Sequence, residues 1–157
     1  MEVTIRKYRS KDRDAVMDIT DRGFAGFCLD ENVEKLFGDI SGTSWQSRKK
    51  KAITYDLDHR PADTLIAEVD GQVAAYACTR LYRGRSVGHV ANMAVAPEFQ
   101  GEGVGKALLK AALEHFRENG MDYARIETLE QNYKAKKFYP RMGFKEVGKR
   151  IYYFREL

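Results

Sequence analysis

The sequence predicts one α/β domain of the α+β type, in which a mixed, mostly antiparallel sheet is flanked by helices. Its 157 residues suffice for one substantial core but not for two ordinary domains. Three strand-like segments follow one another across residues 64–95, ahead of the strongest helical pattern, so strands and helices do not strictly alternate. No repeat, linker or low-complexity segment divides residues 1–157. A single domain spanning residues 1–157 is therefore expected.

The N-terminal part predicts one strand followed by helices. VTIRKY at 3–8 alternates with the period of a strand, and Ser10 is expected to cap a helix formed by KDRDAVMDIT. ENVEKLF and SWQSRKKKAITYDL predict two further helices, separated by the loop GDISGTS. The basic run SRKKK at 47–51 is interpreted as a solvated helix face, with binding of an anionic partner as the alternative.

The clearest local pattern is a hairpin around Asp70-Gly71. TLIAEV and QVAAYACTRLY flank this dipeptide, which favours a tight primed turn. RGRS turns the chain again into the strand VGHVANMAV, whose pairing ends at Pro97 because proline has no N–H to donate. Residues 103–119 carry one apolar row at helical spacing, and Asn119-Gly120 is expected to end that helix.

The C-terminal part predicts a strand, a short helix and a closing strand. YARIETLE at 123–130 has strand character, and NYKAKKFYPRMGF carries a short helix that ends near Pro140. KEVGKRIYYFREL alternates apolar and polar residues, which predicts one further strand or a pair of strands at the end of the sheet.

Composition narrows the class of protein. The net charge of +4 suits an anionic cofactor but is too small for a dedicated nucleic-acid binder. The N-terminus lacks the apolar core of a signal peptide, and no apolar run approaches the ~20 residues that span a bilayer. Cys28 and Cys78 stand alone, and the three histidines are too scattered for a metal-binding pair. We expect a cytoplasmic protein with reduced thiols, without a metal and without membrane or nucleic-acid partners.

A glycine-rich segment, QGEGVGKALL at 100–109, opens the strongest helix. It fails the P-loop spacing, because Gln100 stands at the first glycine position and Ala107 at the hydroxyl position. It also fails the dinucleotide fingerprint, because Lys106 stands at the third glycine position. Small residues still let backbone N–H groups converge at the positive end of a helix dipole. This pattern predicts a site for a pyrophosphate-like anion that needs no magnesium; the alternative is a helix start that binds nothing.

QGEGVG fits the Q/R-x-x-G-x-G/A signature of the GNAT superfamily of acyl-CoA-dependent N-acetyltransferases. The preceding VANMAVAPEF resembles the family's strand leading into that loop, and N-x-x-A-x-x-F-Y-x-x-x-G-F at 132–144 is similar to its second motif. This resemblance covers residues 87–146. It implies a GNAT-like fold with a splayed central strand pair, and acetyl-CoA as the acyl donor for a primary amine.

The resemblance also implies roles for individual residues. The pyrophosphate of coenzyme A would lie on Gln100, Gly101, Glu102, Gly103, Val104, Gly105 and Lys106, chiefly on their backbone amides. The pantetheine arm would lie along Met93, Ala94 and Val95, with a backbone N–H near Met93 or Val95 polarising the thioester carbonyl. Asn132 would contact the pantetheine or cap its own helix.

Proton transfer requires an acid and a base. Tyr139 occupies the position that the family commonly uses as general acid, and a phenol with pKa ~10 stays protonated until the thiolate leaves. His89 lies four residues before Met93, so period two would place both on one face, and its imidazole suits a base. Glu127 is a second candidate base, and ordered water is a third possibility. A structural role is the alternative for each side chain.

The acceptor is not defined by the sequence. In this fold the acceptor site is built by the segments that correspond here to residues 20–60 and RIYYFREL, so a small-molecule or peptide amine is expected. Two other classes are compatible with the sequence: a non-catalytic acyl-CoA sensor of the same fold, and a basic interaction module that uses SRKKK and the lysines of NYKAKK. Dimerisation is common in the family, and the sequence leaves a homodimer undecided.

Overall fold

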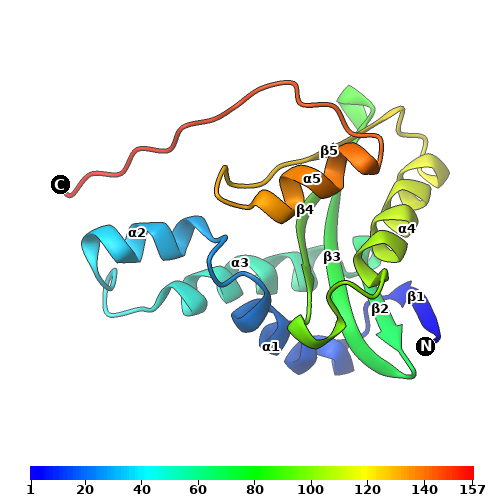
Figure 1. Ribbon diagram of the computed structural model, residues 1–157, viewed down its shortest axis with the longest axis horizontal. Helices are drawn as coiled ribbons and strands as arrows, with labels where there is room; N and C mark the ends of the chain where they lie inside the picture. Colours follow the sequence, from blue (N-terminus) through cyan, green and yellow to red (C-terminus); the bar gives the residue numbers. More distant parts are fainter.

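A computed structural model describes all residues from Met1 to Leu157. Its centre is a five-stranded sheet in the order β1-β2-β3-β4-β5 (Figure 1). The strands are β1 (Val3–Lys7), β2 (Thr64–Val69), β3 (Gln72–Tyr82), β4 (Val87–Val95) and β5 (Tyr123–Ile126). The first four pair antiparallel, while β5 is parallel to β4. The expected mixed, mostly antiparallel sheet is therefore confirmed.

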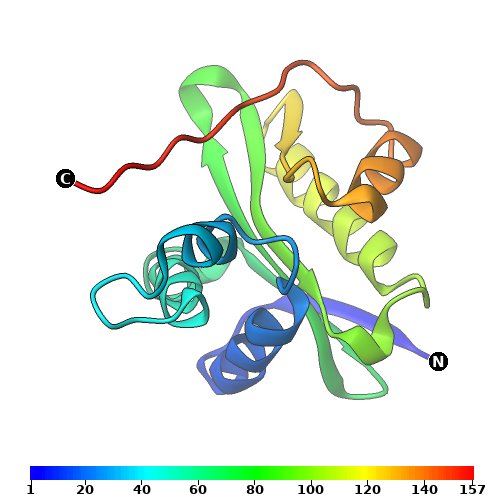
Figure 2. The same cartoon turned by 60° about the vertical axis from the view of Figure 1, so that its left-hand side comes forward.

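Helices cover both faces of this sheet, as the edge-on view in Figure 2 shows. On one face lie α1 (Arg13–Gly23) and α3 (Trp45–His59), with α2 (Leu29–Phe37) packed against α3. On the other face lie α4 (Val104–Glu118) and α5 (Tyr133–Arg141). Each face has its own core because apolar side chains alternate between the two sides of each strand. No helix combines the length and apolar character that a membrane crossing requires.

Local sequence accounts for the turns that bound these elements. Asp70 and Gly71 both adopt positive φ, at 49° and 83°, as a primed hairpin turn requires. Gly120 adopts a φ of 76° directly after α4, which confirms the predicted helix end. Ser10 is not the cap that we expected. The carboxylate of Asp12 accepts the N–H of Arg9 at 2.8 Å instead, and a 3₁₀ turn precedes α1.

The interpretation of SRKKK as a solvated face is wrong for its central residues. Arg48 pairs with Asp30 of α2, Lys49 donates to Asn92 of β4 at 2.6 Å, and Lys50 pairs with Asp21 of α1 at 3.0 Å. These basic side chains therefore tie α3 to the neighbouring elements rather than presenting a free cationic surface.

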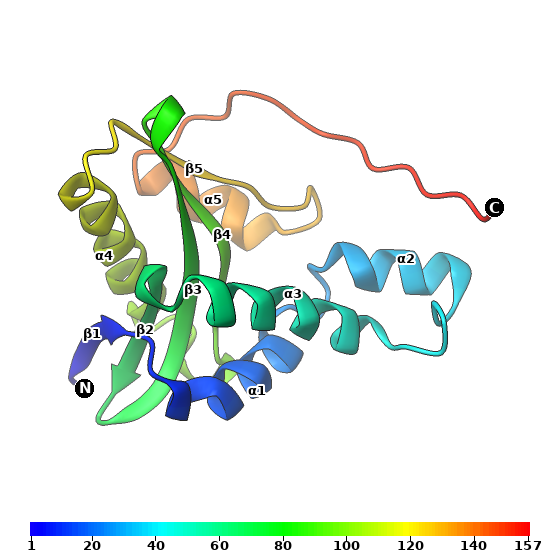
Figure 3. The ribbon, with the colours of Figure 1, turned by 180° about the vertical axis from the view of Figure 1, so that it is seen from behind.

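The C-terminal segment differs most from expectation. β5 has only 4 residues, so the strand predicted over 123–130 stops at Ile126. Residues 145–157 alternate as predicted but are extended and unpaired, and every one of them is exposed. Seen from behind in Figure 3, this tail runs clear of the body, above α2. A strand exists only where a neighbour completes its hydrogen bonds, and the tail has no neighbour within this chain.

Candidate active site

The two halves of β4 have different neighbours. β5 pairs with β4 only from Val87 to Val90, so beyond that point β4 is bonded to β3 alone. The N–H of Ala96 donates to Ala74 of β3 at 2.9 Å. Because backbone groups alternate in an antiparallel pair, the N–H and C=O of Met93 and Val95 point away from β3. The splayed strand pair is therefore present, and its open edge presents main-chain groups.

A β-bulge lies at the start of this open edge. Relative to β3, β4 carries one extra residue, Ala91, between Val90 and Asn92. Met93 packs against the core under α4, whereas His89 is paired with Arg80 of β3, whose side chain reaches α3. The expectation that His89 and Met93 share one face is therefore wrong, because the bulge breaks the two-residue period between them.

The glycine-rich turn leads from β4 into α4. Gly101 and Gly103 adopt φ values of 85° and 82°, and Gly103 is the N-cap of α4 without any side-chain cap. No backbone N–H from Gly101 to Lys106 donates a hydrogen bond within the protein. The side-chain amide of Gln100 donates to the carbonyl of Val95 at 3.1 Å and so fixes the turn to the end of β4. The turn thus offers consecutive free amides at a helix N-terminus, which is an anion-binding arrangement.

A basic groove of about 640 Å³ runs along α4 toward the end of α5. Its polar lining is four basic side chains and one acidic one, namely Lys106, Lys110, Arg117, Arg141 and Glu114. The groove includes Lys106 and so extends the anion-binding arrangement from the first turn of α4. No group of three or more His, Cys, Asp or Glu side chains is placed to hold a metal ion.

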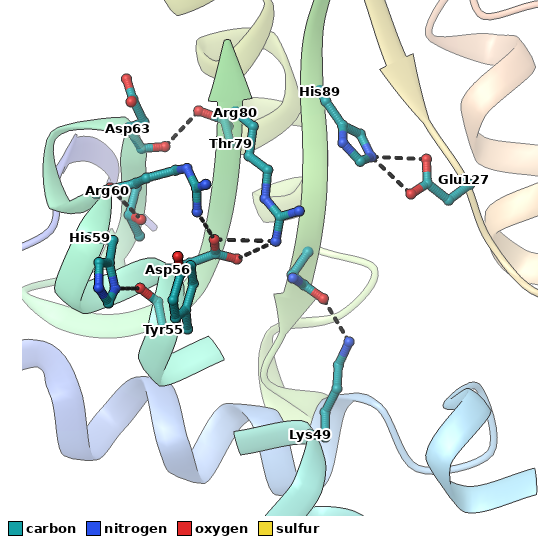
Figure 4. A network of polar contacts seen from close by, with 12 residues as sticks. Lys49, Tyr55, Asp56, His59, Arg60, Asp63, Thr79, Arg80, His89 and Glu127 are labelled. Carbon is teal, nitrogen blue, oxygen red and sulfur yellow. Dashed lines mark hydrogen bonds and ion pairs between the residues drawn. The ribbon is translucent and has the colours of Figure 1, made fainter. Parts of the chain in front are cut away.

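The two candidate bases lie in direct contact (Figure 4). The imidazole Nε2 of His89 lies 2.8 and 2.9 Å from the two carboxylate oxygens of Glu127. His89 is only 5% exposed, whereas the side chain of Glu127 is 49% exposed, so the carboxylate is the accessible end of the pair. Burial raises the pKa of Glu127, but the hydrogen bond from His89 and the charge of Arg125 outweigh it and hold that pKa below its usual value. Glu127 is therefore ionised at neutral pH.

Tyr139 lies on α5, half-buried between Phe138 and Phe144. Its hydroxyl makes no hydrogen bond within the protein, so it is free to donate to a bound molecule. Burial, together with the charge of Glu127, raises the pKa of Tyr139 to about 12. The phenol is therefore protonated at neutral pH.

The open edge of β4, the glycine-rich turn and α5 all lie in a part of the chain that matches a known protein family. The Acetyltransferase (GNAT) family matches residues 30–144, which is most of the chain. The chain belongs to this family. GNAT membership supports an acyl-CoA-dependent N-acetyltransferase as the general activity of the protein. A comparison with curated proteins finds no significant match.

Solved structures share the fold. The PaiA N-acetyltransferase from Thermoplasma acidophilum, in complex with coenzyme A, is 20% identical with a TM-score of 0.74, covering 92% of this chain and 91% of its own. The ribosomal-protein-S18-alanine N-acetyltransferase from Escherichia coli is 21% identical with a TM-score of 0.69, covering 94% and 80%. Ard1 from Thermoplasma volcanium is 24% identical with a TM-score of 0.70, covering 94% and 86%. At these identities the similarity concerns the GNAT fold alone.

The second GNAT motif begins at Asn132, which is the N-cap of α5. Its side chain accepts the N–H of Ala135 at 3.2 Å and donates to the hydroxyl of Thr128 at 3.0 Å. The structure therefore shows the capping role. A contact between Asn132 and pantetheine stays a prediction.

Two polar features of this GNAT protein were not predicted. The ammonium of Lys49, bonded to Asn92, lies 4.3 Å from the centre of the Phe24 ring, and burial lowers its pKa. Nearby, the fully buried carboxylate of Asp56 accepts from Arg60 at 2.8 Å and from Arg80 at 3.2 Å (Figure 4). The four-residue spacing of Asp56 and Arg60 is the only sequence pattern that indicates any of these contacts. The contacts with Asn92 and Arg80 depend on how α3 packs against the sheet.

Proposed function

We propose that the protein transfers an acetyl group from acetyl-CoA to a primary amine by direct attack of the amine on the thioester. The observation that carries this proposal is the run of free backbone amides from Gly101 to Lys106, next to the open edge of β4. A diphosphate satisfies such amides without a metal ion, and an extended arm satisfies such an edge.

The donor would lie across the turn and the open strand. Residues Gln100–Lys106 hold the pyrophosphate, and the basic groove beside Lys106 and Lys110 accommodates the remaining phosphate of coenzyme A. The pantetheine arm extends along Met93, Ala94 and Val95. The outward N–H of Met93 or Val95 then donates to the thioester oxygen, which gains negative charge as the amine attacks.

Two proton movements accompany the transfer. An ordinary amine has a pKa of ~10.4, so it must lose a proton before it attacks. The half-exposed carboxylate of Glu127, held by His89, attracts the ammonium and takes this proton directly or through water. As the new C–N bond forms and the C–S bond breaks, the protonated Tyr139 donates its proton to the departing thiolate. The amine nitrogen loses its second proton as it becomes an amide, and this proton returns through water to the Tyr139 phenolate.

Matched glycine variants test the donor site. Gly103→Val and Gly120→Val place a branched side chain at positive φ before and after α4, at positions where an added Cβ meets no atom within 4 Å. We expect similar losses of stability in both, and at least tenfold weaker calorimetric binding of coenzyme A only in Gly103→Val. Folded wild-type protein that gives no heat with coenzyme A would refute the donor site.

A panel of acceptor amines tests the reaction itself. Free-thiol release from acetyl-CoA should depend on one class of small-molecule or peptide amine. Tight coenzyme A binding without turnover for any amine would instead establish the non-catalytic sensor.

A further inference from the structure

We infer that the acceptor of the acetyl group is a small molecule that carries a carboxylate as well as its primary amine, as an amino acid does, and that Lys49 binds this carboxylate. This inference rests on the proposed acetyl transfer. It begins from an ammonium group that lies beside the open edge of β4 and has no anionic partner.

Lys49 differs from its neighbours on α3. The basic residues on either side, Arg48 and Lys50, each pair with an aspartate. Lys49 forms no ion pair, and its only hydrogen bond is to the side-chain oxygen of Asn92 at 2.6 Å. Its ammonium also lies over the ring of Phe24, and burial lowers its pKa. An ammonium has three N–H groups, so two of them remain free for an anion, which would offset the loss of water around this charge.

Asn92 places this ammonium where the acceptor is expected. It lies in the open half of β4, directly before Met93, whose backbone N–H is one of the two proposed to donate to the thioester oxygen. Its side chain lies on the face of the sheet that carries α3, whereas Met93 packs against the core beneath α4. A group held by Lys49 would therefore lie close to the thioester, on the face of the sheet away from α4.

The surrounding side chains add positive charge to this face. The fully buried carboxylate of Asp56 is shared by Arg60 and Arg80, so this group of three carries more positive than negative charge. In Figure 4, Lys49, Arg80 and Glu127 lie around one stretch of β4. A simple amine would bring one more positive charge to this face, whereas an amino acid brings no net charge. The charges therefore favour an acceptor with its own carboxylate.

The negative charge of Glu127 and the positive charge of Lys49 can bind the two ends of one small molecule. Glu127, which is proposed to attract the amine, is bonded to His89 of β4. Lys49 is bonded to Asn92 of the same strand. The residues of β3 that pair with His89 and Asn92 are two positions apart, which corresponds to roughly 7 Å along the strand. We therefore expect the amine and the carboxylate to be separated by a few bonds, as in an amino acid.

A connection beside these charges favours a small molecule over a peptide. The side-chain amide of Gln131 donates to the carbonyl of Gly26 at 2.8 Å and exchanges two hydrogen bonds with the amide of Asn32, both at 3.0 Å. These bonds join the segment between α1 and α2 to the segment between β5 and α5. The first segment contacts Lys49 and the second contains Glu127, so the connection leaves less room for a polypeptide than for a small molecule.

Matched acceptors test the class of substrate. Glycine, β-alanine and γ-aminobutyrate are each compared with their amides, which keep the amine and lack the negative charge. For at least one of these pairs, wild type should use the amino acid with a kcat/KM at least about tenfold higher than that of the amide, as expected for a hydrogen bond between charged groups. Free-thiol release from acetyl-CoA measures this preference.

Two variants test whether Lys49 is the carboxylate-binding residue. Lys49→Gln should lower the preference for the amino acid at least about tenfold, mainly through KM, with little change for the amide. Asn92→Asp gives the Lys49 ammonium a carboxylate within the protein, so it should raise stability toward urea and lower the same preference. Lys51→Gln, at an exposed position of α3, is the control. A purely structural role for Lys49 would change both substrates equally.

The outcomes separate this inference from the acetyl transfer on which it rests. Equal acetylation of amino acids and amides by wild type overturns the inference and leaves acetyl transfer intact. So does a preference that survives in Lys49→Gln or in Asn92→Asp, because another group then binds the carboxylate, and so does a peptide acceptor that wild type uses better than every amino acid. No turnover of any amine overturns the proposed acetyl transfer together with this inference.

Discussion

The two halves of β4 differ in their backbone pairing: one half is part of the sheet scaffold, and the other is open along the edge where we propose that the donor binds. From Val87 to Val90 the strand is bonded on both edges, and Gly88 and Val90 lie against the core beneath α4. From Ala91 onward only β3 is bonded, and the other edge is free beside the glycine-rich turn. The open edge is therefore created by the end of β5 and by the bulge at Ala91, rather than by a change in the residue types of β4.

The bulge also determines which face of the sheet each side chain of β4 lies on. Met93 and Val95 keep their side chains in the core, so only their main chain faces the open edge. His89 and Asn92 point to the other face, where they meet Glu127 and Lys49. The proposed contacts with acetyl-CoA are therefore made by the backbone of β4, whereas the proposed proton transfer from the amine uses side chains.

The largest loss of stability is expected from a substitution in the half of β4 that is paired on both edges. An added Cβ at Gly88 would lie 2.2 Å from the ring of Phe116, so Gly88→Ala forces the ring or the backbone to move. We expect a loss of about 3 kcal/mol in the free energy of unfolding, measured by urea denaturation. Gly84→Ala, where an added Cβ meets nothing within 4 Å, should cost far less. Adding Phe116→Leu to Gly88→Ala should partly restore the stability. A Gly88→Ala protein as stable as wild type would contradict the close contact between Gly88 and the Phe116 ring.

On α5, Tyr139→Phe should separate an effect on catalysis from an effect on folding. The hydroxyl makes no hydrogen bond within the protein, so the free energy of unfolding and the affinity for coenzyme A should hardly change. Loss of the proton donor should lower kcat by about 100-fold, the lower end of the range for general acids. Tyr133→Phe on the same helix, where Tyr133 is 70% exposed, is the control. Unchanged turnover in Tyr139→Phe would assign the thiolate proton to another donor.

Glu127→Gln should have a smaller effect at the boundary between the halves. Loss of the carboxylate removes the group proposed to attract the amine, and we expect kcat/KM to fall about tenfold at neutral pH. This is less than the roughly 100-fold lower end for acid–base groups, because water can take the proton in place of Glu127. The pKa of Glu127 is lowered by folding, so its ionised form stabilises the protein above the ordinary value of ~4.3. That stability is lost as the pH falls through the lowered pKa.

Urea denaturation between pH 3 and pH 6 measures this dependence. The advantage of wild type over Glu127→Gln should be constant at the upper end and shrink toward the lower end. Glu118→Gln serves as the control, because Glu118 forms no ion pair in the structure. An advantage that grows on acidification would reverse the sign and contradict the His89–Glu127 interaction.

Local patterns predicted much of the fold because their causes are local. Asp70-Gly71 favours one turn geometry, and the glycines before Lys106 predict an anion-binding helix start from backbone freedom alone. Ala91 carries no such pattern, since any residue can be the extra one in a bulge. The contact between His89 and Glu127 depends on the parallel register of β4 and β5, which a short alternating segment does not fix. Strand character in the tail was visible, but no segment of this chain pairs with residues 145–157, so no strand forms there.

The smallest change is expected from substitutions of Asn132, which can separate its role as the N-cap of α5 from a contact with pantetheine. Asn132→Ala removes the N-cap of α5 and should cost about 1 kcal/mol of stability, whereas Asn132→Asp keeps an oxygen that caps equally well. If Asn132 also contacts pantetheine through its amide N–H, Asn132→Asp should weaken coenzyme A binding while the free energy of unfolding stays near that of wild type. If capping is its entire role, only Asn132→Ala should change, and the change should appear in stability. Parallel calorimetry and urea denaturation on both variants distinguish these outcomes, because the cap accepts a hydrogen bond whereas that pantetheine contact would require a donor.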